Sequence, residues 1–373
     1  MCSVPRGRVA LVAGYPYAFG GAERVLELLA RELLARGWSV RVVLPDDGEV
    51  ARHLTTAGLS VDVVKAPRPL LVYGRRAAQG LRAVAAAVAL PLYWLRIRRR
   101  IHDVDLVHAF GQRGVLLVGP AASSLGVPLV WHVGAAEPGR TVNRFAATMA
   151  SAVVAVSSAA AEHVPGRARP TIVANAVDPA VFDAGAVGSD DGADIISAAR
   201  LTAEKGVDVL VRAVALLRDR GHNVRAAVLG PRQPGHEAYA DHVASLATEL
   251  GVADAVSFPG FVDQPFRHRA GARVYVQPSR QEGFGLAAAE AMASGLPVVA
   301  SGIGGLAEVV GDAGVLVPPD DPQALADAVG ALLDDPERAA RLAAAGRERA
   351  ATTYTVERMV DGIEAVYRSI SRA

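Results

Sequence analysis

The sequence is poor in cysteine, in aromatic residues and in long apolar runs. Its single cysteine, Cys2, excludes an internal disulfide and fits a reducing compartment. No uninterrupted apolar run reaches the roughly 20 residues that a membrane-spanning helix needs. The apolar run at residues 9–13 is too short for a secretory signal. These absences predict a cytoplasmic protein and leave open a contact with the inner face of a membrane.

An excess of charge is also missing. The chain has 39 Lys and Arg against 38 Asp and Glu, and its formal net charge of +1 gives no general case for binding nucleic acid. Its 373 residues, of which 51% are hydrophobic, are enough for two domains of ordinary size with large cores.

The most informative stretch is residues 278–297, which predicts a strand end, a glycine loop, a short helix and a new strand. Without a Cβ atom, Gly283 and Gly285 let a ligand approach the backbone, and the helix N-terminus offers N–H groups to phosphate. The carboxylates of Glu282 and Glu290 would repel phosphate but accept hydrogen bonds from hydroxyls. This stretch alone therefore predicts a phosphorylated, polyhydroxylated ligand.

The first half of the chain begins with the pattern of a parallel sheet. Residues 8–13 predict a buried strand, residues 22–36 an amphipathic helix and residues 38–44 a second strand. The pair Gly20 and Gly21 then falls at the carboxyl end of the first strand, where open α/β sheets bind ligands. A simple packing turn remains the alternative for this pair.

Further short strands are expected in the first half, with polar or glycine-bearing loops gathered at one sheet edge. His132 ends one of these strands, and on its position alone it is better interpreted as a structural histidine. The expected strands are 60–64, 106–108, 129–133 and 153–157, and the loops are 108–111, 132–134 and 157–158.

The second half repeats the α/β pattern after a linker rich in Gly, Ala and Asp at residues 183–194. Residues 195–198 predict a strand, 207–219 a helix, and 273–277 the strand leading to Glu282. The chain is therefore predicted to be α/β, with two Rossmann-like halves. Further strands are expected at 224–230, 256–262 and 297–301, and helices at 239–250, 306–310, 322–333, 337–354 and 355–369.

Two cations follow the first strand of the second half. Arg200 and Lys205 could neutralise a diphosphate and stabilise it as a leaving group, although isolated surface cations would look the same. No metal-ligating cluster is evident. The acidic pair Asp103 and Asp105 has a spacing found at some metal sites, but we interpret it as a polar lead-in to a strand.

Residues 65–102 contain no Asp or Glu and many arginines, with an apolar run between them. Tyr93 and Trp94 lie beside the basic cluster. One interpretation is a peripheral membrane contact, with aromatic residues at the interface and arginines on anionic lipid. A basic groove for an anionic acceptor and a core helix followed by a solvated basic turn are the alternatives.

Taken together, these motifs resemble the retaining GT-B glycosyltransferases of family 4. The segment from Glu282 to Glu290 resembles the family's E-x7-E signature, and residues 200–206 resemble R-L-x-x-x-K-G. The resemblance covers nearly the whole chain. It also includes the first glycine loop at residues 20–23, the strand ending in histidine at 130–132, residues 175–178 with Ala176 in a glycine place, the G-G-x-x-E stretch at 304–308 and the loop at 314–321. Residues 230–235 depart from the family's G-x-G.

The resemblance implies a GT-B fold of two Rossmann-like domains facing a central cleft. Residues 1–183, joined by a helix at 355–373 that crosses back, would form the acceptor domain. Residues 184–354 would form the donor domain. The family needs no metal and no cofactor, because the nucleotide-sugar is a substrate.

The resemblance also assigns roles to residues. Arg200 and Lys205 would hold the diphosphate, Glu290 the ribose, and His132 and Glu282 would act at the donor hexose. The remaining donor-binding positions would be Gly20, Gly21, Phe261, Val262, Gly283, Phe284, Gly285 and Leu286.

The expected activity is transfer of a hexose with retention of configuration from a nucleoside diphosphate sugar, with UDP favoured, to an acceptor hydroxyl. The acceptor could be lipid-linked, a polysaccharide or a small natural product. Two alternatives stay open: a nucleotide-sugar epimerase or phosphorylase of the same fold, and a non-catalytic nucleotide-sugar-binding partner of another protein.

Overall fold

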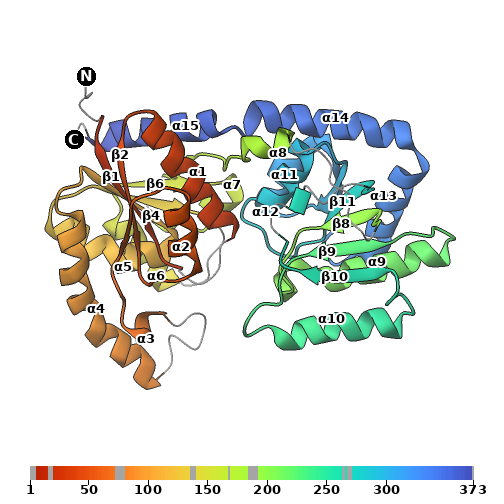
Figure 1. The fold of residues 1–373 in the computed structure, drawn as a ribbon, viewed down its shortest axis with the longest axis horizontal. Helices are drawn as coiled ribbons and strands as arrows, with labels where there is room; N and C mark the ends of the chain where they lie inside the picture. The colour runs from red at the N-terminus through yellow and green to blue at the C-terminus, as the bar shows by residue number, and fades with distance from the viewer. Residues whose placement is uncertain are drawn as a thin grey trace. The chain divides into compact units, whose positions relative to one another are not determined.

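The structure is a computed structural model, and it describes residues 6–15, 20–71, 80–134, 140–166, 169–183, 192–262, 265–266 and 271–371. The chain divides into two compact units (Figure 1). The first unit is Met1–Ala174 with Val356–Ala373, and the second is Asn175–Thr355.

The first unit contains a parallel seven-stranded sheet in the order β3-β2-β1-β4-β5-β6-β7. The predicted strands are present, and the sequence order reverses between β1 and β4, as expected for a Rossmann-like unit. The strands are β1 (Arg8–Ala13), β2 (Ser39–Leu44), β3 (Val61–Val63), β4 (Leu106–Phe110), β5 (Leu129–Val133), β6 (Ala152–Ala155) and β7 (Thr171–Ile172).

Helices connect these parallel strands. The helix predicted after β1 is confirmed as α1, and its buried residues repeat at helical spacing. The helices of this unit are α1 (Gly21–Ala35), α2 (Glu49–Thr56), α3 (Arg68–Leu71), α4 (Gly80–Ile101), α5 (Gly111–Ser124), α6 (Arg140–Met149), α7 (Ser158–Ala161) and α15 (Val356–Ser371).

One predicted loop of the first unit is a strand instead. Residues 108–110 continue β4, and α5 begins directly at Gly111. Phe110 pairs in register with His132 of β5, so the sheet extends further toward its carboxyl edge than the polar residues suggested. This extension places His108 inside the sheet, where its side chain is fully buried.

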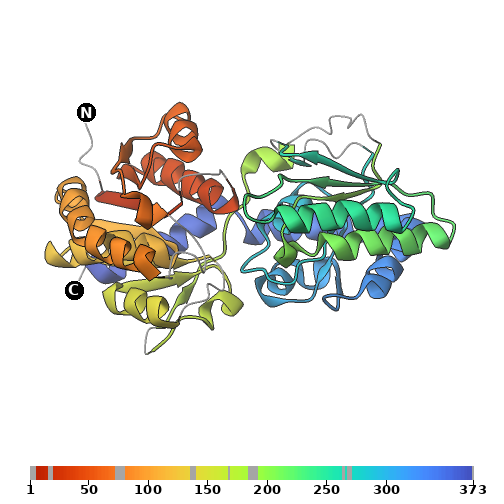
Figure 2. The same ribbon diagram turned by 90° about the horizontal axis from the view of Figure 1, so that it is seen from below.

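The second unit contains a parallel six-stranded sheet in the order β10-β9-β8-β11-β12-β13. Figure 2 shows helices along this sheet. The strands are β8 (Ile195–Ser197), β9 (Ala226–Leu229), β10 (Val256–Gly260), β11 (Val274–Gln277), β12 (Val298–Ser301) and β13 (Val315–Val317). The helices are α8 (Pro179–Asp183), α9 (Val207–Asp219), α10 (Glu237–Glu249), α11 (Leu286–Ala293), α12 (Gly304–Val310), α13 (Pro322–Asp334) and α14 (Pro336–Thr353).

The second unit begins at Asn175, ahead of the expected boundary between residues 183 and 184. Val177 N–H donates to the Tyr354 carbonyl at 2.8 Å, and Arg347 Nη2 donates to the Phe182 carbonyl at 2.8 Å. These bonds tie α8 and the chain before it to α14. Of the linker expected at residues 183–194, residues 184–191 lie outside the described residues.

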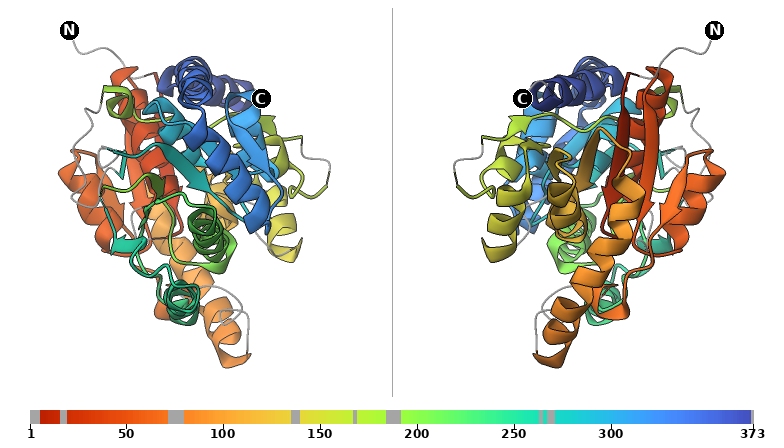
Figure 3. Two further views of the ribbon diagram at one scale, coloured as in Figure 1. Left: turned by 90° about the vertical axis from the view of Figure 1, so that its right-hand side faces the viewer. Right: turned by 90° about the vertical axis from the view of Figure 1, so that its left-hand side faces the viewer.

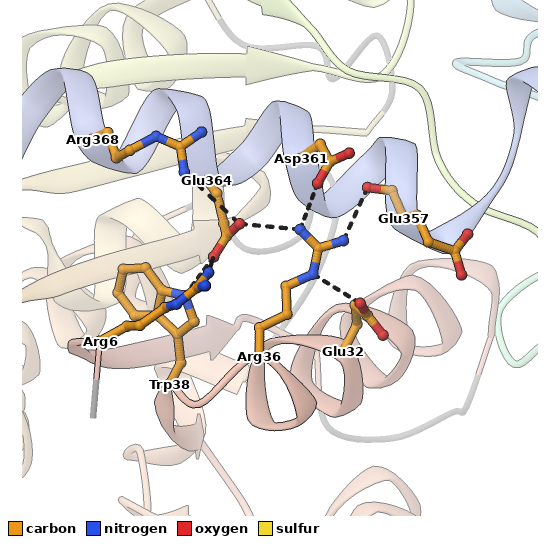
Figure 4. A network of polar contacts seen from close by, with 8 residues as sticks. All are labelled: Arg6, Glu32, Arg36, Trp38, Glu357, Asp361, Glu364 and Arg368. Atoms are coloured by element: carbon orange, nitrogen blue, oxygen red, sulfur yellow. Dashed lines mark hydrogen bonds and ion pairs between the residues drawn. The ribbon is translucent and has the colours of Figure 1, made fainter. Parts of the chain in front are cut away.

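The final helix, α15, returns to the first unit, as the family resemblance implied. Its apolar side packs against α1 and β6, and Figure 4 shows the polar contacts at its edge. Trp38 Nε1 donates to Glu364 Oε1 at 2.7 Å, and Arg36 Nη1 contacts Glu364 at 3.0 Å and Asp361 at 2.5 Å. These contacts join the end of α1 and the start of β2 to the last helix of the chain.

Candidate functional site

The candidate site lies at the carboxyl edge of the second unit's sheet. Strand β8 lies between β9 and β11, so the sequence order of the strands reverses there. The loop after β8 carries Arg200 and Lys205, and the loop after β11 carries Glu282. Because ligands of open α/β sheets bind at such a reversal, this edge is the expected position for the site.

The two loops meet through one ion pair. Lys205 Nζ lies 2.7 Å from Glu282 Oε2, and both side chains are less than one-fifth exposed. Gln277 Nε2 donates to the same oxygen at 2.9 Å, and Tyr275 Oη lies 3.1 Å from Gln277 Oε1. Glu282 is therefore held in one position by a cation from one loop and an amide from the end of β11.

Arg280 forms a second link between the loops. Its guanidinium makes a bidentate contact with Asp208 at 2.9 and 2.7 Å and donates to the Ala203 carbonyl at 2.8 Å. It also contacts Asp320 at 2.5 Å. No role was predicted for Arg280, Asp208 or Gln277. Arg280 and Asp208 are 72 positions apart in the chain, and Gln277 is close to its partners but belongs to no motif itself. The one available sequence signal was that Arg280 lies two residues before Glu282, in the loop of the E-x7-E signature.

Glycine allows the two loops to approach. Gly206 has φ +63°, and a Cβ atom there would lie 2.0 Å from the Pro278 carbonyl oxygen. A Cβ atom at Gly305 would likewise lie 2.0 Å from the carbonyl oxygen of Gly283. Gly206 and Gly305 thus serve the close packing of one backbone on another.

Helix α11 follows the Glu282 loop as predicted. Gly285 is its N-cap with φ +96°, Leu286 is its first residue, and Glu290 is buried with 4% exposure. Burial, together with the charges of Glu282 and Glu290, raises the pKa of Tyr275. Both carboxylates of the signature therefore act on the buried phenol beneath the site.

The other predicted donor-binding residues of this unit lie on the same sheet edge. Arg200 is exposed on the loop after β8. Phe261 follows β10 and is 60% exposed, which is unusual for a large apolar side chain. Val262 is half-buried beside it, whereas Gly283 and Phe284 are buried in the loop before α11.

His132 belongs to a buried polar chain in the first unit. His132 Nδ1 lies 3.1 Å from His108 Nε2, and His108 Nδ1 lies 2.7 Å from Tyr367 Oη on α15. Phe110 stacks on the His132 ring, with centroids 4.7 Å apart. Burial, with the neighbouring His132, holds the pKa of His108 well below its ordinary value. His108 is thus a neutral, fixed partner that orients His132.

The glycine pair of the first unit forms the start of a helix. Gly20 is the N-cap of α1, and its N–H donates to Glu23 Oε2 at 3.1 Å. Gly21 is the first residue of α1. This position at the end of the β1–α1 connection agrees with the ligand-edge location predicted from the sequence.

The acidic pair before β4 has structural contacts, as the sequence interpretation expected. Asp103 binds Arg41 at 2.9 and 3.2 Å, and Asp105 Oδ2 accepts from the Arg8 N–H at 2.7 Å. Among the described residues, no three His, Cys, Asp or Glu side chains are grouped so that they could hold a metal ion.

Two sequence families, one for each half, together match most of this chain. The family described as Glycosyl transferases group 1 matches residues 185–349, and Glycosyltransferase Family 4 matches residues 19–181. The chain belongs to glycosyltransferase family 4. The ion pair of Lys205 with Glu282 and the helix carrying Glu290 fall within the first match, and His132 falls within the second.

Curated relatives are similar to this chain over part of their length. A D-inositol 3-phosphate glycosyltransferase of Thermomonospora curvata is 43% identical over 45% of this chain and 41% of its own length. The lipopolysaccharide core biosynthesis mannosyltransferase LpsB of Rhizobium meliloti is 34% identical over 46% of this chain and 50% of its own length. Glycogen synthase of Mycobacterium tuberculosis is 35% identical over 56% of this chain and 50% of its own length. The chain thus spans about half the length of the curated relatives it matches.

Solved structures have the same GT-B fold. Anabaena HepE in complex with UDP and glucose has a TM-score of 0.83 and 24% identity, covering 98% of this chain and 100% of its own. The sucrose-phosphate synthase of Thermosynechococcus elongatus has a TM-score of 0.78 and 23% identity, covering 98% and 99%. The predicted fold class is therefore confirmed for this family 4 chain.

Proposed function

We propose that this protein is a retaining glycosyltransferase that moves a hexose from a UDP-sugar to an acceptor hydroxyl without a metal ion. The observation that supports it most is the contact of Lys205 with Glu282 at the sheet edge, beside Arg200. One loop brings cations suited to a diphosphate, and the other brings a carboxylate suited to sugar hydroxyls. The match to both halves of family 4 supports the same activity.

The residue roles follow from charge and position. Arg200 and Lys205 neutralise the diphosphate, both in the bound donor and as it leaves. Glu290 accepts from the ribose hydroxyls, and Glu282 and the backbone of residues 283–286 hold the hexose. Phe261 and Val262 line the nucleobase, and an exposed aromatic ring suits stacking on a base.

In the transfer step, the acceptor oxygen attacks the anomeric carbon on the face from which the diphosphate leaves. A new C–O bond forms, the bond to the diphosphate oxygen breaks, and the acceptor proton passes to the leaving phosphate. His132 and the glycine pair Gly20 and Gly21 contribute from the first unit, which meets the acceptor. The choice of UDP is supported by HepE, whose structure contains UDP and glucose.

A donor panel tests this function. UDP-, GDP-, ADP- and dTDP-sugars are compared by thermal shift and by slow donor hydrolysis, with and without EDTA. We expect a UDP-sugar to give the largest shift, EDTA to have no effect, and the anomeric proton of the product to keep the donor configuration by NMR. Donor interconversion without acceptor, or binding without any turnover, would instead indicate the epimerase or binding-protein alternatives.

Replacement of Lys205 gives the sharpest single test. Lys205→Ala removes the cation facing the diphosphate and should weaken UDP binding at least about tenfold, because charge-assisted hydrogen bonds contribute about 1.5 to 3 kcal/mol. The control is Lys65→Ala, at the exposed lysine outside the site. Equal UDP affinity and turnover in the two variants would rule out the assigned role.

A further inference from the structure

The helix α4 presents a row of exposed aliphatic side chains. Val84, Val88, Leu92 and Leu95 are 60%, 70%, 61% and 60% exposed. At about 100° per residue they lie within a sector of about 80° of the helix. Single exposed apolar residues are common on protein surfaces, but a continuous row on one helix face marks a surface that another phase or partner covers.

The opposite side of α4 fixes the helix to the unit. Tyr93, Ile97 and Ile101 are buried, and Trp94 Nε1 donates to the Leu116 carbonyl of α5 at 3.1 Å. One interpretation of the sequence put Tyr93 and Trp94 at a membrane interface. Tyr93 is buried instead, and Trp94 is half-buried with its indole N–H bonded to α5. Figure 3 shows one end of α4 (orange) projecting away from the other elements of the first unit.

Arginines continue the same face of α4. Arg96, Arg98 and Arg99 are exposed at its carboxyl end. By the same helical geometry, Arg99 falls within the sector of the aliphatic row, and Arg96 and Arg98 fall on either side of it. The whole segment 65–102 contains no Asp or Glu, so this face carries no negative charge of its own.

We propose that α4 docks the protein on the surface of an anionic lipid bilayer. The row of Val84, Val88, Leu92 and Leu95 enters the boundary between headgroups and acyl chains, and Arg96, Arg98 and Arg99 contact lipid phosphates. An anionic bilayer has an apolar layer that complements the aliphatic row and negatively charged headgroups that complement the arginines of the same face. Among the described residues no helix is long and apolar enough to cross a membrane, so the contact is a surface contact.

This docking surface does not depend on the proposed sugar transfer, and vesicle binding tests it separately. The full chain is sedimented with vesicles of phosphatidylcholine alone and of phosphatidylcholine mixed with phosphatidylglycerol, at low and at high salt. We expect binding to the mixed vesicles only, weakened by salt because exposed charges are screened.

Two variants divide the surface into its parts. Val88→Gln with Leu92→Gln removes two of the four side chains of the apolar row, and Arg96→Gln with Arg98→Gln and Arg99→Gln removes the three arginines. Each should lower the vesicle partition coefficient at least about tenfold. The controls are Leu34→Gln on α1 with Leu250→Gln at the end of α10, and Arg338→Gln with Arg341→Gln on α14. They change exposed apolar and basic residues elsewhere and should bind as the wild type does.

Three results would overturn the proposal. The first is no binding to anionic vesicles at low salt, and the second is unchanged binding of both α4 variants. The third is a wild-type protein that self-associates in sedimentation velocity, does not bind vesicles and becomes monomeric in Val88→Gln with Leu92→Gln, which would make the row a protein interface. Thermal melting and UDP affinity, measured on every variant, separate a folding defect or a failed donor site from a docking defect.

Discussion

At the residue scale, Gly206 has the most demanding position of the candidate site. It combines a left-handed backbone with an approach to Pro278 that leaves no room for a Cβ atom. It directly follows Lys205, so it sets where the cation meets Glu282. Its place in the R-L-x-x-x-K-G motif therefore has a physical reason in the contact between the two loops.

Gly206→Ala should destabilise the second unit by about 3 kcal/mol or more, since backbone strain and a clash add together. It should also weaken UDP binding, because Lys205 moves with the loop. Urea unfolding and a UDP titration measure the two effects. The control is Gly251→Ala, where φ is +69° but no atom lies within 4 Å, and only the strain of about 1 to 2 kcal/mol is expected. Equal losses in both variants would mean that the contact with Pro278 does not matter.

His108 should make the first unit sensitive to acid. Its pKa is held well below the ordinary value by burial, so the folded state stays neutral where the unfolded state binds a proton. As pH falls below about 6.5, the unfolded state gains protons that the folded state does not, and the free energy of unfolding drops by about 1.4 kcal/mol per pH unit. The stability that neutral His108 contributes is fully present above about pH 6.5. It is lost as the pH falls toward the lower pKa that His108 has in the folded state.

The variant His108→Gln tests this dependence. Glutamine can still hydrogen-bond but cannot titrate, so the stability of the first unit should fall less steeply between about pH 6.5 and 5. Urea midpoints measured through that range for both proteins give the comparison. Parallel pH profiles would show that another group causes the acid sensitivity.

At the element scale, α15 depends on a buried carboxylate. The Glu364 side chain is 5% exposed and contacts Trp38, Arg36 and Arg6. Burial opposes its ionisation, but the hydrogen bonds from Trp38 and Arg36 prevail and lower its pKa. Its ionised form therefore stabilises the folded state above about pH 4.5, and that contribution is lost as pH falls below this value.

Glu364→Gln should lower the free energy of unfolding of the first unit by about 1 to 3 kcal/mol at neutral pH, with a smaller difference near pH 4. Denaturant unfolding at the two pH values gives the measurement. The control is Asp361→Asn on the same helix, which should cost less than about 1 kcal/mol because that side chain is 69% exposed. A larger loss from Asp361→Asn would place the stabilising contact at the helix surface.

Two elements show where sequence patterns were insufficient. Helix α5 contains Gly119 and Pro120 and begins at Gly111 with φ +68°, so its composition did not predict a helix. Strand β13 has three residues and pairs only at the sheet edge with β12. In both cases packing on neighbouring strands determines the structure that local propensity leaves open.

At the scale of the whole molecule, each unit has its own sheet and its own core. We expect calorimetry to show two transitions, because each unit has its own sheet and core and can unfold cooperatively by itself. UDP at about 100 times its Kd should stabilise the transition of the second unit by about 2.7 kcal/mol. Glu364→Gln should lower the temperature of the other transition, that of the first unit. A single transition whose temperature shifts both with UDP and with Glu364→Gln would contradict this division.

The sequence by itself determined the family and the two parallel sheets, and it selected the candidate site residues whose roles stay predictions. Apolar periodicity marked β1, α1, α9 and β11, and the motif spacing identified Lys205, Glu282 and Glu290, because those signals are local or carried by short fixed loops. Only the tertiary structure revealed that Arg280 and Asp208 join the loops, that Tyr367 holds His108 against His132, and that Trp94 bonds to α5. These contacts join residues far apart in the chain, and no local pattern records which distant side chain completes a hydrogen bond or which face of a helix is covered.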